Sequence, residues 1–216
     1  MGALAQQFVP GDPAPAQAEI VLLHLGCNHK QTPESIGLEI TTMDGTPDPR
    51  PVRMVNLDMN PGVNPDVLCC LGKDPIDLPD NSVDLVIALH VLEHIGESPG
   101  DVKAWWLFWN ELYRVMKHGT VIQFECPYYS SLWAWADPTH VRAISEMSFL
   151  YLNQDAYTVG GAIPDYRPLC DFEVVGDLEK IPDHTNANVR AIEQVSFIRG
   201  RLRARKPLRP YWERVK

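Results

Sequence analysis

The sequence predicts an open, doubly wound α/β domain with a mostly parallel sheet, and three observations lead to this prediction. Short apolar runs without strict alternation recur along the chain, as expected of strands that are buried on both faces. A long segment with helical spacing of its apolar residues separates two of these runs. Near the C-terminal end, two strand-like runs stand too close together for a crossover helix, which favours an antiparallel hairpin.

Five apolar runs give the expected parallel strands: EIVLLHL (19–25), PVRMVNLD (51–58), PDVLCCL (65–71), VDLVIAL (83–89) and TVIQFEC (120–126). The segment between the last two, DVKAWWLFWNELYRVMKHGT (101–120), is the predicted helix. Its KHG sequence supplies a basic last turn and a glycine stop, so we expect the helix to end near Gly119. The hairpin is expected in FEVVGDLEKI (172–181) and EQVSFIRGRL (193–202).

The length and composition fit one globular domain. The chain has 216 residues, of which 45% are hydrophobic, and contains no apolar run of the ~18 residues that cross a bilayer. Residues 1–18 lack the basic and apolar regions of a secretory signal, so we expect a flexible leader. The domain is then expected over 19–200, followed by a basic C-terminal tail over 201–216.

The net charge and the cysteine content limit the possible binding partners and the cellular compartment. The net charge of -9 disfavours a protein that coats nucleic acid, although the tail carries seven Lys or Arg against one Glu. This tail is expected to be a solvated extension, and contact with phosphates or nucleic acid is the less favoured alternative. Five cysteines without a C-x-x-C pair argue against a disulfide framework and favour a reducing, cytoplasmic location.

Ligands of doubly wound domains bind at the carboxyl ends of the strands, so the residues directly after each apolar run are the candidates. The first run leads into LHLGCN (23–28), and the second ends at Asp58. An acidic residue at that point suits two ribose hydroxyls, while a role in starting the MNPG turn is the structural alternative. The third run ends at Cys70 and Leu71, and the fourth leads into HVLEH (90–94).

Together these segments resemble class I S-adenosylmethionine-dependent methyltransferases. LHLGCN resembles their first motif, and residues 54–95 resemble a type 11-like subgroup with a Pro-Gly-Val turn, an "lPdnSfD" segment and HVLEH. The segment WADPTHVRAISEMSFLYL (135–152) resembles the DPTHxR segment of the same subgroup. The resemblance covers roughly residues 19–155. It implies a Rossmann-like, seven-stranded sheet and methyl transfer from S-adenosyl-L-methionine to a small-molecule or nucleotide-type acceptor.

The resemblance also implies the residues that bind the cofactor: Leu25, Gly26, Cys27, Asn28, Asp58, Met59, Cys70, Leu71 and His90. Gly26 would let the backbone approach the methionine part of the cofactor. Asn28 replaces the usual glycine, and Asn tolerates positive φ better than most residues. Cys70 replaces the usual Asp near the adenine, so this contact is expected from the backbone of Cys70 and Leu71.

The acceptor side is expected after the fifth strand. His140 is the candidate base, with Asp137 and Tyr129 as further catalytic candidates, and Arg142 is a candidate anion clamp. The structural alternative is an ion pair between Asp137 and Arg142 that holds the loop. The residues expected to bind the acceptor are Glu93, Tyr128, Trp135 and Arg142.

The H-x-x-E-H spacing of His90, Glu93 and His94 also occurs in inverted zinc peptidases. Here His90 directly follows a run rich in β-branched residues, so it ends a strand and need not share a helical face with His94. The sequence offers no convincing third ligand, and no metal site is expected. A zinc hydrolase using His90 and His94 and a non-catalytic protein with this cofactor fold are the alternative functions.

Overall fold

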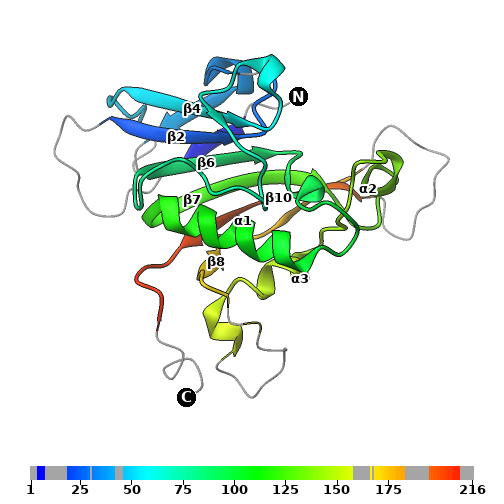
Figure 1. The fold of residues 1–216 in the computed structure, drawn as a ribbon. Coiled ribbons are helices and arrows are strands. Elements are labelled where there is room, and N and C mark those ends of the chain that lie inside the picture. The colour runs from blue at the N-terminus through cyan, green and yellow to red at the C-terminus, as the bar shows by residue number, and fades with distance from the viewer. Residues whose placement is uncertain are drawn as a thin grey trace.

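The computed structural model describes residues 4–7, 19–29, 31–41, 46–157, 166, 168–182 and 195–209, and a mixed β-sheet forms its centre (Figure 1). Five parallel neighbours run in the order β5 (Val67–Leu68), β4 (Val52–Asp58), β2 (Ile20–Leu25), β6 (Val83–Leu89) and β7 (Met116–Pro127). The antiparallel strand β10 (Val195–Ala204) follows, with β8 (Phe172–Val174) beyond it and β9 (Glu179–Pro182) also paired to it. This confirms the predicted fold class, with one short strand more than expected.

The strand order reverses between β2 and β6. From β2 the chain adds β4 and then β5 on one side, and it then returns to form β6 on the other side of β2. The carboxyl ends of β2, β4, β5 and β6 therefore meet at one edge of the sheet. A crevice for a ligand is expected at this reversal.

The long helix α1 (Val102–Val115) covers one face of the sheet (Figure 1). Its first turn is capped by Asp101, whose Oδ1 accepts a hydrogen bond from the backbone N–H of Ala104 at 3.0 Å. Trp109 on its inner side is fully buried and contacts the rings of Phe149 and Phe172. The helix is thus fixed to the sheet by apolar burial along its whole length.

The predicted helix end near Gly119 is wrong, because α1 stops at Val115 and β7 begins at Met116. Pairing with β6 starts at Met116 and, after a register shift, continues from Val121. The backbone hydrogen bonds of a central strand therefore outweigh the local stop signal, which the side chains of Lys117 and His118 had suggested.

Other helices among the described residues are short. They are η1 (Glu34–Ile36), η2 (Pro61–Val63), η3 (Leu92–His94), α2 (Trp133–Ala136), α3 (Glu146–Leu150) and η4 (Gln154–Tyr157). On the second face of the sheet, Leu22, Leu85 and Ile87 pack against residues of η1 and of β3 (Leu38–Thr41). A short 3-10 turn and a strand cover this region, where a doubly wound sheet usually has a long helix.

Strand β3 pairs in parallel with β1 (Leu4–Gln7) in a separate two-stranded sheet. The latter strand lies within residues 1–18, which the sequence analysis assigned to a flexible leader. Main-chain pairing forms this contact, and the Ala, Pro and Gln content of the segment does not reveal it. The remainder of the predicted leader lies outside the described residues.

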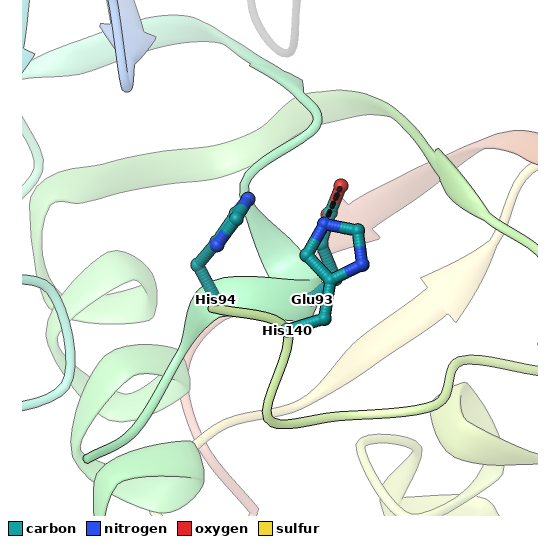
Figure 2. Close-up of side chains that lie close together, drawn as sticks. All are labelled: Glu93, His94 and His140. Atoms are coloured by element: carbon teal, nitrogen blue, oxygen red, sulfur yellow. Dashed lines mark ion pairs between the residues drawn. The ribbon is translucent and has the colours of Figure 1, made fainter. Parts of the chain in front are cut away.

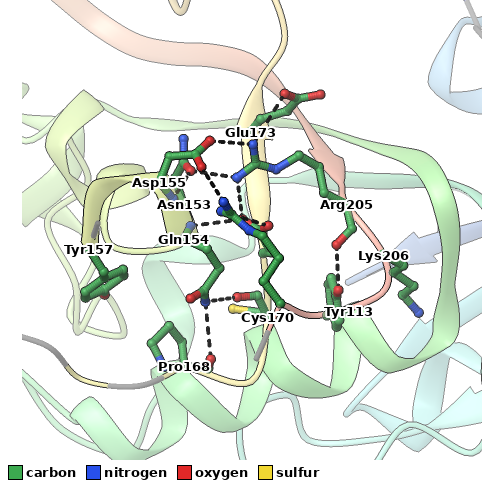
Figure 3. Close-up of polar contacts among 12 residues, drawn as sticks. Tyr113, Asn153, Gln154, Asp155, Tyr157, Pro168, Cys170, Glu173, Arg205 and Lys206 are labelled. Carbon is green, nitrogen blue, oxygen red and sulfur yellow. Dashed lines mark hydrogen bonds and ion pairs between the residues drawn. The ribbon is translucent and has the colours of Figure 1, made fainter. Parts of the chain in front are cut away.

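The predicted boundary at residue 201 also shifts, because β10 continues to Ala204. Beyond the strand, Arg205 lies 2.6 Å from carboxylate oxygens of both Asp155 and Asp171, and Arg209 lies 2.6 Å from Asp155 (Figure 3). The first half of the expected tail is therefore part of the domain. Residues 210–216 lie outside the described residues, and no described helix is long and apolar enough to cross a membrane.

Candidate active site

A pocket of about 690 Å³ opens where the carboxyl ends of β2, β4, β5 and β6 meet. Six of the residues expected to bind the cofactor line it: Gly26, Asp58, Met59, Cys70, Leu71 and His90. The wall is mainly apolar and is completed by residues before and within α1, among them Ala104 and Leu107. Such a shape and lining are typical of a small-molecule site.

The turn after β2 is built by Gly26 and Asn28. Both have left-handed backbone conformations, with φ of 59° and 48°, so the expected tolerance of Asn28 for positive φ is met. A Cβ on Gly26 would lie 2.8 Å from Cγ2 of Val91, so the turn requires glycine on packing grounds as well. The side chains of Leu25 and Cys27 point into the core and do not line the pocket.

Asp58 closes this turn from the neighbouring strand. Its Oδ2 accepts the backbone N–H of Asn28 and its Oδ1 accepts that of Asn60, both at 2.9 Å. An ionised carboxylate has about four acceptor positions, so further hydrogen bonds to a ligand are available. Asp58 can thus both form the turn and bind a ligand, which are the two roles considered from the sequence.

The backbone of Cys70 is engaged within its own turn. Its N–H donates to Oδ2 of Asp74 at 3.0 Å, and its carbonyl accepts the N–H groups of Lys73 and Asp74. The Cys70 N–H is therefore engaged within the turn, and the expected adenine contact from the backbone around Cys70 and Leu71 stays a prediction. Leu71 remains on the pocket wall together with Gly72, whose added Cβ would lie 2.8 Å from the carbonyl of Ala104.

His90 leaves β6 with a φ of 56° and lines the pocket, as its expected place at the strand end implies. Its ring lies between two carboxylates, with Nε2 3.4 Å from Glu125 and Nδ1 3.5 Å from Glu93. These carboxylates, Glu125 first, raise the pKa of His90 to about 9. At neutral pH the ring is therefore a cation and cannot accept a proton from an acceptor.

The residues expected to bind the acceptor lie beside this pocket and do not line it. Glu93 is buried, and Tyr128 is buried with its hydroxyl donating to Glu146 at 3.0 Å. Trp135 is 70% exposed, and its Nε1–H donates to the carbonyl of Tyr129, itself 45% exposed. The aromatic side chains of Tyr129 and Trp135, in the loop around α2, thus face solvent.

The structure gives Arg142 partners that neither expectation named. Its Nη2 donates to the backbone carbonyls of Asp101 at 2.6 Å and Ile95 at 3.1 Å, and its guanidinium lies 4.5 Å from the centroid of the Trp105 ring. Among the described residues it forms no ion pair with Asp137, and the carboxylate that interacts electrostatically with its guanidinium is that of Asp101. Arg142 instead ties the DPTHxR segment to two residues of the pocket wall.

Asp137, Thr139 and His140 of that segment lie around the HVLEH turn. Asp137 accepts hydrogen bonds from the N–H and hydroxyl of Thr139, and the hydroxyl also lies 3.1 Å from Nδ1 of His94. The His140 ring stands edge-on to that of His94, with centroids 4.7 Å apart (Figure 2). His90 and His94 do not share a helical face, as expected, since η3 begins only at Leu92.

Several pocket residues were missed by sequence reasoning. Lys73 and Glu97 form an ion pair at 2.8 Å on the wall, and Asp101 and Lys103 stand at the start of α1. The rule that ligands bind after the strands would have included Glu97 if it had been extended past HVLEH. No local signal marks Lys103, because its place depends on how α1 lies over the sheet edge.

Comparison with known proteins supports the class of this site. Residues 23–124 match the family model of a methyltransferase domain. The match includes the turn after β2, all of β4 and β6, and the HVLEH segment. It supports a class I S-adenosylmethionine-dependent methyltransferase, with S-adenosyl-L-methionine as cofactor, as the sequence predicted. A comparison with curated protein sequences gave no match.

Solved structures are similar in fold. The N-methyltransferase NodS from Bradyrhizobium japonicum, in complex with S-adenosyl-L-homocysteine, is 11% identical with a TM-score of 0.51. That match covers 87% of this chain and 79% of the other. A methyltransferase from Archaeoglobus fulgidus is 17% identical, with a TM-score of 0.47 and 85% and 86% coverage. At these identities the likeness is one of fold.

Proposed function

We propose that this protein transfers a methyl group from S-adenosyl-L-methionine, bound in the pocket at the carboxyl edge of the sheet, to a small-molecule or nucleotide-type acceptor. The observation that carries the proposal is the pocket itself. It joins a glycine turn without room for a Cβ, a carboxylate with acceptor positions to spare and an apolar wall. These are the features that a nucleoside-containing cofactor requires.

Each part of the wall has a proposed task toward the cofactor. Gly26 admits the methionine part, and Asp58 accepts hydrogen bonds from the ribose hydroxyls. Met59, Leu71 and the neighbouring apolar residues enclose the adenine, with the backbone beyond Cys70 supplying polar contacts. The bound cofactor supplies an electrophilic methyl group, so the protein has to orient the acceptor and exclude water.

The acceptor is proposed to approach from the side of α2. Trp133 and Trp135 are 52% and 70% exposed there, and Tyr129 is 45% exposed. Exposed aromatic rings next to a ligand pocket favour a planar or ring-containing acceptor, which stacks on them.

Substitution of Asp58 tests the cofactor site. We expect Asp58→Asn to weaken binding of S-adenosylmethionine roughly tenfold or more, because removal of a charge-assisted hydrogen bond costs ~1.5–3 kcal/mol. Calorimetric titration measures this, with Asp177→Asn as the matched control, since Asp177 lies in an exposed turn after β8. Equal affinity in both variants would contradict the proposed role of Asp58.

Methyl transfer is tested with an acceptor screen that includes nucleotides, phenols, sugars and carboxylates, read out as S-adenosylhomocysteine formed. Activity with a member of these classes is expected. Cofactor binding without turnover on any class would favour the alternative of a non-catalytic cofactor-binding protein.

A further inference from the structure

Glu93, His94 and His140 form a cluster that the pocket alone does not explain. Each offers one atom that can bind a metal, and these atoms lie within 4.8 Å of one another (Figure 2). Glu93 and His94 come from η3, whereas His140 comes from the loop after α2. A backbone hydrogen bond from Val141 N–H to the carbonyl of Glu93, at 3.0 Å, holds the two segments together.

The carboxylate of Glu93 is buried, and its charge is only partly balanced, because it shares the His90 ring with Glu125. Its side chain is 1% exposed, and neither Oε1 nor Oε2 has a hydrogen-bond partner. The nearest nitrogens are Nδ1 of His90 at 3.5 Å and Nε2 of His140 at 4.0 Å, both too long for strong hydrogen bonds. A buried carboxylate is costly unless it is paired or binds a metal. His90 is shared between two carboxylates and forms no short hydrogen bond to Glu93, so Glu93 has acceptor positions open toward a further cation.

The hydrogen bonding of His140 leaves a nitrogen lone pair directed at the cluster. Its Nδ1 lies 3.3 Å from the carbonyl oxygen of Ala134, which can only accept, so Nδ1 carries the proton. In the neutral ring Nε2 is then the unprotonated atom, and this is the atom that faces Glu93. A backbone carbonyl that fixes the second nitrogen of a histidine is typical of metal-binding histidines.

The tautomer of His94 follows from its neighbour Thr139. The Thr139 hydroxyl has one proton, and it donates this proton to Oδ1 of Asp137 at 2.6 Å. It can therefore only accept from Nδ1 of His94, 3.1 Å away, so Nδ1 carries a proton. The lone pair of the neutral His94 ring is thus on Nε2, as in His140. Asp137 and Thr139 together orient a histidine in the way that outer hydrogen-bond partners orient metal ligands.

We propose that Glu93, His94 and His140 bind a divalent first-row transition-metal ion. Two imidazole nitrogens and one carboxylate favour Mn²⁺, Fe²⁺, Co²⁺ or Zn²⁺ over Mg²⁺ and Ca²⁺, which prefer oxygen ligands. Three protein ligands leave coordination positions open for water or an oxygen of a ligand. Because His94 also lines the pocket, an oxygen-bearing acceptor can reach such an ion. This last point rests on the proposed function, whereas the metal site itself does not.

Metal binding is measured on the full chain after treatment with EDTA. We expect one equivalent of Mn²⁺ or Zn²⁺ by calorimetry, and visible absorption bands of protein-bound Co²⁺. Glu93→Gln and His140→Ala are expected to lower the affinity at least 100-fold and to abolish the Co²⁺ bands. His29→Ala is the matched control, since His29 is exposed and outside the cluster, and it should bind as the unchanged chain does.

Thr139→Val provides a milder variant that removes only the orienting hydroxyl. It should weaken metal binding ~10- to 100-fold, the usual effect of losing an outer hydrogen-bond partner. Circular dichroism and titration with S-adenosylhomocysteine verify that each variant is folded.

Two results would overturn the metal site: no bound ion in the unchanged chain, or equal affinity in the unchanged chain and in a folded Glu93→Gln variant. Retained cofactor binding without metal binding would refute this inference alone. Metal binding without cofactor binding would refute the proposed function and leave the metal site standing.

Discussion

Arg142 illustrates at the residue scale how far a sequence pattern can predict a role. The DPTHxR resemblance draws attention to this residue, and two roles were open from its charge alone. The structure gives it a third, since it donates to two backbone carbonyls and lies over Trp105. Folding brings backbone carbonyls from different segments together around a cationic side chain. The sequence contains no signal for the positions of these carbonyls, so it does not predict which acceptors the cation contacts.

We expect Arg142→Met to lower the free energy of unfolding by about 1–3 kcal/mol, because two buried carbonyls lose a charged donor. Urea denaturation measures this loss. Arg53→Met is the control, since Arg53 forms an exposed ion pair with Glu19, which should contribute at most ~1 kcal/mol. Equal losses in both variants would contradict the positioning role of Arg142.

The residues that line the pocket at the strand ends were more predictable than the contacts of the loop after α2. Gly26, Asp58 and His90 stand directly after strands, so the topological rule places them at one edge without knowledge of any contact. By contrast, His94 and His140 meet only because the loop after α2 folds back onto η3. The sequence therefore indicates no third ligand for the H-x-x-E-H pattern, although it suggests Glu93 and His140 for other roles.

At the scale of elements, strands with continuous apolar runs were predictable and element ends were not. The predicted strand 83–89 coincides with β6, whereas the run 65–71 contains only the two-residue strand β5. The difference is one of position, since β6 lies between two neighbours and β5 lies at the sheet edge. An edge strand has half the pairing partners, so its length depends less on its own side chains.

Strand β10 requires glycine where it crosses the core. A Cβ on Gly200 would collide with Cδ2 of Leu178 and approach Cζ of Phe124 to 3.1 Å. We expect Gly200→Ala to destabilise the fold by about 1–3 kcal/mol, the usual cost of overpacking. Thermal and urea unfolding measure the change. An unchanged midpoint would show that β10 does not pack as closely on Phe124 as the structure indicates.

On the scale of the whole molecule, the C-terminal segment is joined to the domain by charge. The sequence predicts a solvated tail because the acidic partners of its basic residues are far away in the sequence. Figure 3 shows Arg205 among Asp155, Glu173 and neighbouring groups. A local count of basic residues cannot reveal such pairing, and so the extent of the domain was underestimated.

This network makes stability depend on pH in a defined direction. Arg205 foremost, with Arg209, holds the pKa of Asp155 below its ordinary value of 3.8. A lowered carboxyl pKa contributes stability above the ordinary value, and this contribution disappears as the pH falls through the lowered pKa. We expect Asp155→Asn to be less stable than the unchanged chain at pH 6, and the two to converge as the pH falls through the lowered pKa of Asp155.

Urea titrations across this range measure the difference, and Asp177→Asn should show none at either end. A constant difference between Asp155→Asn and the unchanged chain at all pH values would contradict the ion-pair origin of the effect.

The most direct test of the central claim is a crystal structure of the chain with S-adenosylhomocysteine. We predict that the ligand fills the pocket at the carboxyl edge, with its amino-acid part at Gly26, its ribose at Asp58 and its adenine beside Leu71. A ligand bound elsewhere, or an empty pocket at saturating concentration, would contradict the account.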